Sequence, residues 1–253
     1  MKYLIQVLAF ACYTFSCNQI HEKLDYNGKD SSAVDIYYAK HCCNDQPSTS
    51  FGTPGKGSLT NGKLMPFSGS NFHYFDTLSY LNGRAYLHNK VKITILETYK
   101  SLFVQHPNDL FGLMECSHET GGQLFPHRTH QNGLSVDFMC PKLKDDKPYF
   151  GLDYIGRAHY FLGFDDSGRY TEDTSIRLNF DLMALHILEL DQIARHHGLK
   201  IKKVILKMEL KDEFYATPNG NKVKANGIYI TKKLPPSVNR AHDDHFHVDF
   251  EFL

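Results

Sequence analysis

Two segments far apart in the chain carry side chains of the kinds that bind metal ions and move protons. Residues 127–137 and residues 242–247 together contribute His127, His130, Asp137, His242, His245 and His247. A catalytic zinc site takes three protein ligands from His and Asp or Glu and leaves a fourth position for water. If the two segments meet, they supply such a ligand set and further imidazoles that can transfer protons. A metal ion with a neighbouring proton carrier can hydrolyse an unactivated amide.

The hydrophobic pattern predicts that both segments enter β-strands. Residues 131–133 favour a turn, and apolar residues then alternate with polar ones, so Asp137 points away from the apolar face. In residues 245–252 the aromatic and aliphatic side chains alternate with His, Asp and Glu. Residues two apart on a strand point the same way, roughly 6.5–7 Å apart, so we expect His245 and His247 to face one site. A turn after His130 would bring its imidazole back over Asp137.

Several other kinds of site are excluded by spacing or charge. A helical His-x-x-x-His zinc motif is absent, and no Cys-x-x-Cys pair is present to form a structural thiolate site. The glycine-rich run 52–58 is not a phosphate-binding loop, because Gly57 is followed by Ser58 and Leu59. With 28 basic and 28 acidic residues, the chain offers no electrostatic case for binding nucleic acid or an anionic membrane face.

The two segments resemble the active-site motifs of the penicillin-insensitive murein endopeptidases. This family belongs to a metallopeptidase group that also holds lysostaphin-type enzymes, D-alanyl-D-alanine peptidases and the hedgehog signalling domain. Weaker similarity extends to residues 114–118, Gly121-Gly122, and residues 52–59 and 62–66, so the resemblance covers the chain from about residue 50. The chain departs from the family pattern at Ser135, where a second acidic residue is usual, and in the long polar segment 142–179.

The resemblance implies a role for each candidate residue. His130, Asp137 and His247 would bind one Zn2+ ion, and His245 would act on the water and the leaving amine. His127 and His242 would flank the site and polarise the scissile carbonyl or orient other groups. Spacing alone does not decide which of His245 and His247 is the ligand.

The activity implied by the resemblance is a zinc metallo-endopeptidase that cuts D-alanyl amide cross-links between peptidoglycan stem peptides. A D,D-carboxypeptidase or dipeptidase on the same scaffold is the near alternative. A zinc-bearing cell-wall binding module without catalysis is an alternative from another class.

Other polar residues near the two segments have two interpretations each. Asp243 and Asp244 could fix the tautomer of a site histidine, or be solvated at the start of a strand. Arg128 could clamp a substrate carboxylate, although an exposed loop arginine is the commoner case. Glu115 and Glu119 could contribute to the site or belong to a polar surface turn.

The N-terminus predicts export. Residues 1–16 have the length and hydrophobicity of a signal peptide, too short for a membrane span. Cys17 then resembles the acylated cysteine of a bacterial lipoprotein, and Asn18 favours sorting to the outer membrane. We therefore expect a tether over residues 17–49, with 50–253 as the metallopeptidase domain, in the periplasm and next to peptidoglycan.

The cysteines agree with an oxidising compartment. Without the leader and the acylated Cys17, the chain keeps Cys42, Cys43, Cys116 and Cys140. Adjacent cysteines pair with each other only under strain. We therefore expect a disulfide from Cys42 or Cys43 to Cys116 or Cys140.

The remaining pattern predicts an α+β fold: a small antiparallel sheet carries the zinc site and helices pack against it, as in the hedgehog and D-Ala-D-Ala peptidase group. Helices are predicted over residues 88–106 and from Asn179 to a stop at Gly198. Further strands are predicted over 202–208 and 226–231. Residues 163–175 have the composition of a surface insertion beside the substrate groove. The histidines at positions 186, 196 and 197 are expected at the helix surface or cap.

Overall fold

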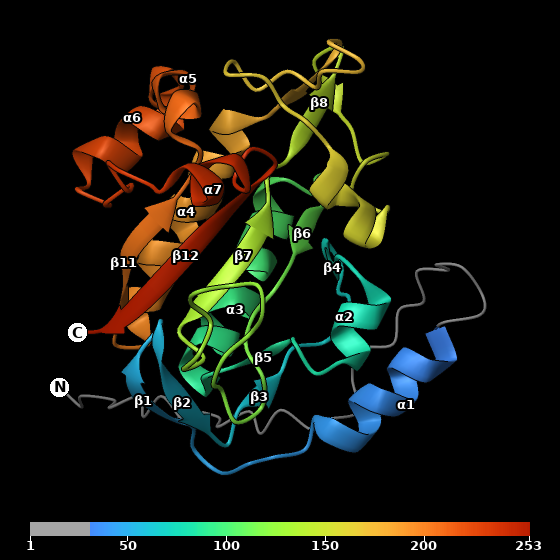
Figure 1. The fold of residues 1–253 in the computed structure, drawn as a ribbon, viewed down its shortest axis with the longest axis vertical. Coiled ribbons are helices and arrows are strands. Elements are labelled where there is room, and N and C mark those ends of the chain that lie inside the picture. The colour runs from blue at the N-terminus through green and yellow to red at the C-terminus, as the bar shows by residue number, and fades with distance from the viewer. Residues whose placement is uncertain (1–30) are drawn as a thin grey trace, which may run out of the picture.

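The computed structural model describes residues 31–253 of the chain. The predicted signal peptide, Cys17 and the first part of the predicted tether lie outside these residues. Within the described part, no helix combines the length and the hydrophobicity that crossing a membrane requires. Helices and small sheets are combined in one α+β arrangement, so the α+β class that the sequence predicts is confirmed (Figure 1).

The largest sheet has five strands, and its central pair carries the two motif segments. Its order is β11 (Leu199–Ile205), β12 (His245–Phe252), β7 (Ser135–Met139), β6 (Phe111–Leu113) and β4 (Phe72–Tyr74). Neighbouring strands are antiparallel except for β6 and β4, which run parallel. The sheet is thus antiparallel where it carries the motifs and mixed at one edge.

The register of β7 and β12 places the polar residues of both strands on one face. His247 lies opposite Asp137, and Asp249 lies opposite Ser135. Because side chains alternate along a strand, the residues between them, such as the paired Phe138 and Phe246, point to the other face. The alternation predicted from the sequence therefore holds in both strands, although every residue of β7 is buried.

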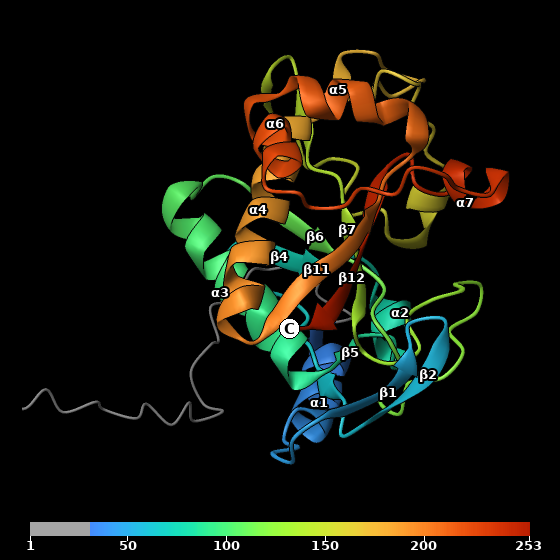
Figure 2. The ribbon, with the colours of Figure 1, turned by 90° about the vertical axis from the view of Figure 1, so that its left-hand side faces the viewer.

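Two long helices, α3 (Asn89–Gln105) and α4 (Phe180–His196), pack against each other and cover the apolar face of the sheet (Figure 2). The His88 side chain caps α3 by accepting from the backbone of Lys90, and Asn179 caps α4 by accepting from Leu182. Gly198 follows α4 with a φ of 72°, the left-handed conformation that ends helices. Both helix predictions are confirmed.

One histidine on α4 was placed wrongly by the sequence prediction. His186 is 1% exposed and lies in the core, with its ring 4.8 Å from that of Phe138 and 5.0 Å from that of Phe111. Burial lowers its pKa to about 3, so the imidazole is neutral. His186 lies within the apolar stripe of α4, where a polar side chain is not expected from the sequence.

The other elements are short. The helices are α1 (Ser31–His41), α2 (Thr77–Leu81), α5 (Lys211–Ala216), α6 (Pro218–Ala225), α7 (Pro236–Arg240) and the 3₁₀ helices η1 (Gly156–Phe161) and η2 (Met208–Leu210). The strands are β1 (Thr49–Thr53), β2 (Lys56–Thr60), β3 (Lys63–Leu64), β5 (Tyr86–Leu87), β8 (Lys142–Lys144), β9 (Lys147–Pro148) and β10 (Ile176–Leu178). The strand predicted over 202–208 is present as β11, shifted towards the N-terminus. The strand predicted over 226–231 is wrong, because there only an isolated bridge joins Ile230 to Val204.

The expected disulfide to Cys116 or Cys140 is also wrong within the described residues. Both are buried free thiols. The Cys116 thiol donates to the carbonyl of Met114, and the Cys140 thiol lies 3.8 Å from the Met183 sulfur. The sulfur atoms of Cys42 and Cys43 lie 3.1 Å apart. Cys116 and Cys140 thus act as small core residues, which sequence spacing cannot distinguish from partners in a disulfide.

Candidate metal centre

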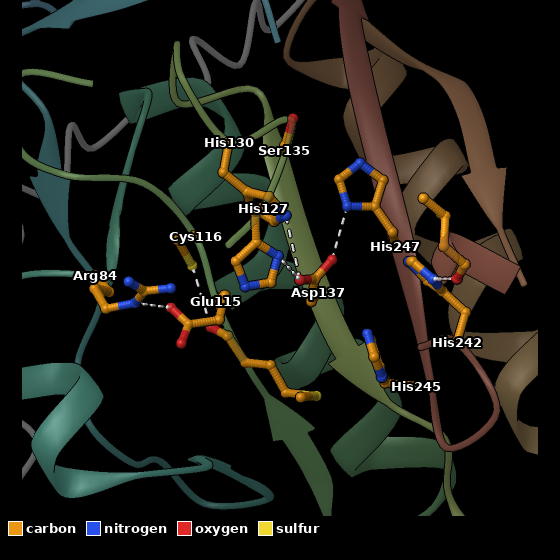
Figure 3. Close-up of polar contacts among 12 residues, drawn as sticks. Arg84, Glu115, Cys116, His127, His130, Ser135, Asp137, His242, His245 and His247 are labelled. Atoms are coloured by element: carbon orange, nitrogen blue, oxygen red, sulfur yellow. Dashed lines mark hydrogen bonds and ion pairs between the residues drawn. The ribbon is translucent and has the colours of Figure 1, made fainter. Parts of the chain in front are cut away.

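The residues predicted to bind metal meet on the polar face of β7 and β12 (Figure 3). Nε2 of His130 lies 3.2 Å from Oδ2 of Asp137, and Nδ1 of His127 lies 3.5 Å from the same oxygen. Nδ1 of His247 lies 2.7 Å from the other oxygen, Oδ1. One ligand atom from each of His127, His130 and Asp137 lies within 4.8 Å of the others, a group that could hold a metal ion.

The loop before β7 brings His130 over the carboxylate through a backbone conformation that is uncommon outside glycine. His130 has a φ of 67°, and Gly133 has a φ of 73°. A Cβ at Gly133 would lie 2.7 Å from the backbone nitrogen of His88, so only glycine fits there. The backbone nitrogen of Gln131 donates to Pro54 in the turn between β1 and β2. The glycine-rich run is therefore part of a hairpin that supports the site loop.

Unpartnered nitrogen atoms in the cluster fit a metal ion. Both ring nitrogens of His130 and Nε2 of His127 are buried and have no hydrogen-bond partner among residues 31–253. Buried polar atoms are nearly always hydrogen-bonded, so unpartnered imidazole nitrogens beside a buried carboxylate fit coordination to a metal ion. The donor set of imidazoles and one carboxylate is the one that zinc and similar divalent ions take.

Hydrogen bonds from behind the cluster fix the orientation of His247. Its Nε2 lies 2.8 Å from Oδ1 of Asp249, and the Ser135 hydroxyl donates to the same oxygen at 2.5 Å. The ammonium of Lys203 lies 3.0 Å from the second oxygen of Asp249. Nδ1 of His247 is therefore the atom that faces Asp137. A carboxylate behind a ligand imidazole in this way sets its tautomer and raises its basicity.

The buried carboxylates and imidazoles of the site strongly shift one another's pKa values. Burial alone would raise the pKa of the Asp137 carboxyl, but the imidazoles of His130 and His247 hold it well below its usual range. Burial also opposes protonation of His247, yet the carboxylates of Asp249 and Asp137 outweigh it and raise the pKa to about 9. Asp137 is thus a carboxylate at neutral pH, which is the form that a metal ion requires.

His245 and His242 lie beside this group, with their ring centroids 4.8 Å apart. Nδ1 of His245 lies 2.7 Å from Oδ1 of Asp244, and burial is outweighed by this hydrogen bond and charge, so the pKa of His245 is raised. Nδ1 of His242 donates to the carbonyl of Val238 at 2.6 Å. Burial lowers the pKa of both His242 and His127 to about 3, so these two imidazoles are neutral.

The other residues named in the sequence analysis divide into buried and exposed ones. Glu115 is buried and holds Arg84 at 2.6 Å, while its backbone carbonyl accepts from the backbone nitrogen of Asp137. Arg128 and Glu119 are exposed. Asp243 accepts from the backbone nitrogen of Phe164 in the 163–175 segment, which therefore packs against the start of the second motif.

Solvent reaches the cluster on the side of His127. The side chains of His127 and Arg84 are each 16% exposed, whereas His130, Asp137 and His247 are essentially buried. Tyr160 from η1 is 47% exposed, and its ring centroid lies 6.5 Å from that of His245. The exposed edge of the cluster is therefore formed by His127 and Arg84, with Tyr160 of η1 near His245.

Two residues that complete the site were missed by the sequence analysis. Asp249 was seen only as a polar position of a strand. His159, whose Nδ1 lies 2.7 Å from Oδ2 of Asp244, lies in the segment that departs from the resembled family. The alternation of β12 does place Asp249 on the site face, so that residue could have been found. No local signal marks His159.

The sequence as a whole matches no protein-family model, and a comparison with curated proteins finds no match either.

Proposed function

We propose that the protein is a zinc metallo-endopeptidase that hydrolyses D-alanyl amide cross-links between stem peptides of peptidoglycan. The observation that carries the proposal is the convergence of His130, Asp137 and His247, with His245 beside them. The substrate class comes from the motif resemblance to the murein endopeptidases, which is also the reason to expect a hedgehog-like arrangement of the α+β fold.

His130 and Asp137 would hold the ion, together with Nδ1 of His247. Zinc, when bound, supplies a Lewis acid that polarises an amide carbonyl and acidifies water to a pKa of about 7. The protein keeps Asp137 ionised and fixes Nδ1 of His247 towards it through Asp249. These groups are in place before any ligand arrives, because the strand register and buried hydrogen bonds set them.

His245 is the proton carrier in this proposal. Its Nδ1 is engaged by Asp244, so Nε2 is left to accept a proton from water and to return one to the leaving amine. Figure 3 shows His245 on the same side of the strands as Asp137. His127 and His242 are neutral at physiological pH and can donate or accept hydrogen bonds without carrying charge into the site.

The location of the substrate agrees with the predicted export. We propose a periplasmic enzyme attached to the outer membrane through an acylated Cys17, with the following residues acting as a tether to the cell wall. Without acylation the protein would be free in the periplasm, next to the same substrate.

One observation favours a second candidate. His127 approaches Asp137 almost as closely as His130 does, and a set of four protein ligands would close the metal site. A closed tetrahedral site is structural, so such a protein would be a zinc-bearing cell-wall binding module. A D,D-carboxypeptidase would share the open site and differ only in the bond that it cuts.

The test is digestion of purified sacculi by wild type, His245→Ala, His130→Ala and the exposed His196→Ala as a matched control, with muropeptides separated by chromatography. We expect wild type and the control to convert cross-linked dimers to monomers. His245→Ala should bind zinc and release little product, and His130→Ala should lose both. Loss of terminal D-Ala with dimers intact would identify the carboxypeptidase. Zinc binding with no product from wild type would identify the binding module.

A further inference from the structure

A second chain of buried polar groups lies directly behind His245. Nδ1 of His245 lies 2.7 Å from Oδ1 of Asp244, and Nδ1 of His159 lies 2.7 Å from Oδ2 of the same carboxylate. All three residues are at most 3% exposed. Each carboxylate oxygen therefore faces one imidazole, and these are the hydrogen bonds that the structure gives the Asp244 side chain within residues 31–253.

His159 comes from the segment 142–179, where the chain departs from the resembled family. Its helix η1 is fastened to the start of α2, because the Arg157 guanidinium and backbone nitrogen both contact the Asp76 carboxylate, at 3.1 and 3.3 Å. The His159 ring also packs edge-on against Phe75, with centroids 5.3 Å apart. The imidazole is thus held at a fixed place against the domain, and within residues 31–253 only its Nδ1 makes a hydrogen bond.

The position of a buried carboxylate depends on both of its oxygens being satisfied. A carboxylate that accepts two opposed N–H bonds cannot turn about its last torsion without breaking one of them. If the bond from His159 is absent, Oδ2 is left buried and unpaired, and rotation of the group towards another donor would withdraw Oδ1 from His245. The tautomer of His245 that presents Nε2 to the metal centre depends on that bond.

We propose that His159 is a positioning residue, which acts through Asp244 to hold His245 in the orientation and tautomer that the hydrolytic site uses. This rests on the proposed function, in which His245 carries the proton. The consequence is that the 142–179 segment is part of the active site's support, and removal of this segment would disable an enzyme whose metal ligands are all present.

The test compares two polar replacements of similar size. The amide of Asn lies where Nδ1 of His does, and that of Gln lies nearer to Nε2, so His159→Asn keeps the donor to Asp244 and His159→Gln does not. His197→Asn is the matched control, because Nε2 of His197 makes an equally short bond of 2.7 Å to Glu97, which Asn does not replace, and His197 lies at the far end of α4. Melting temperature and zinc content are measured for every variant to establish that each is folded and loaded.

On a soluble cross-linked muropeptide we expect His159→Gln to lower kcat by about 10- to 100-fold with KM changed by less than about twofold. His159→Asn should recover to within about fivefold of wild type, and the kcat of His197→Asn should equal that of wild type. Equal kcat for His159→Gln and wild type would overturn the proposal. So would equal losses in the Asn and Gln variants, or loss of a second zinc equivalent on His159 substitution, which would make the cluster a metal site.

A readout independent of activity separates this proposal from the proposed function. Nitrogen-15 NMR of histidine-labelled protein reports which ring nitrogen of His245 carries the proton. We expect a single Nδ1-protonated form in wild type and His159→Asn, and a mixture in His159→Gln. If no variant cleaves murein but this pattern holds, the endopeptidase is refuted and the positioning role stands. An unchanged His245 spectrum in a folded His159→Gln protein refutes the positioning role.

Discussion

Replacing Asp249 by asparagine should weaken metal binding although Asp249 does not touch the proposed ion. Asp249 accepts from His247 at 2.8 Å and from Ser135 at 2.5 Å, and pairs with Lys203 at 3.0 Å. Asparagine keeps the shape and removes the charge. It also offers an amide donor to Nε2 of His247, which favours the tautomer with the proton on Nδ1, the atom that faces Asp137.

The size of the effect follows from the bond that is weakened. A hydrogen bond to a charged partner contributes about 1.5–3 kcal/mol and a neutral one about 0.5–1.5 kcal/mol. Loss of the charge therefore weakens the hydrogen bond that orients His247 by about 1–1.5 kcal/mol. If this energy is lost from metal binding, zinc affinity falls roughly 5- to 10-fold. With the unfavourable tautomer added, we expect zinc affinity to fall by about 10- to 100-fold in Asp249→Asn.

The assay is competition with a chromophoric zinc chelator at about pH 9. At lower pH a second effect opposes the first, because Asp249 helps to raise the pKa of His247 to about 9, and a proton there must leave before metal binds. Glu251→Gln is the control, since Glu251 is two residues further along the same strand and pairs with Lys200 at the surface. Asp249→Asn protein that is folded and binds zinc within about twofold of wild type would refute ligation through Nδ1 of His247.

Three further outcomes are expected. The pKa of His186 is about 3 when folded and near 6.5 when unfolded, so its contribution to stability is complete above pH 6.5 and is lost as the pH falls towards 3. Between about pH 6.5 and about pH 4.5, wild type should therefore lose about 2 kcal/mol more unfolding free energy than His186→Leu, measured by denaturant titration. The exposed His196→Leu variant should lose as much as wild type. Cys116 and Cys140, whose thiol pKa values burial raises, should react with a thiol reagent only after unfolding; rapid reaction of folded protein would contradict their burial. Phe246→Ala should lower the unfolding free energy by about 3–5 kcal/mol, and a loss below about 1 kcal/mol would contradict its place in the core.

The parts of the fold that a short stretch of sequence determines could be predicted. A periodic apolar stripe with an N-cap and a terminal glycine predicted α4 to within two residues at each end, and strict alternation predicted β12. The same alternation correctly turned His245 and His247 to one face. The burial of His186 differs from the average behaviour of helical histidines, because burial is decided by which face of the helix meets the sheet.

What could not be predicted depends on contacts between distant segments. Neither the bond from His159 to Asp244 nor the burial of Cys116 and Cys140 leaves a trace in local periodicity. The mistaken disulfide has the same origin, because compartment and parity of cysteines say nothing about distance in the fold. The strand predicted over 226–231 has suitable residues, but along the outer edge of β11 it forms a single parallel bridge, in which Val204 donates to Tyr229 and accepts from Thr231.

The departure at Ser135 shows how strand pairing can compensate for a missing side chain. The resembled family usually has an acidic residue there, and this chain has a serine, yet the position is opposite Asp249 in the pairing of β7 with β12. The hydroxyl of Ser135 donates to the carboxylate of Asp249. The negative charge at this position of the sheet is therefore carried by β12 instead of β7. An acidic residue at both positions would place two buried carboxylates side by side, which is unfavourable unless one is protonated. Ser135→Asp should therefore destabilise the site of wild type, and should be tolerated when it is combined with Asp249→Ser.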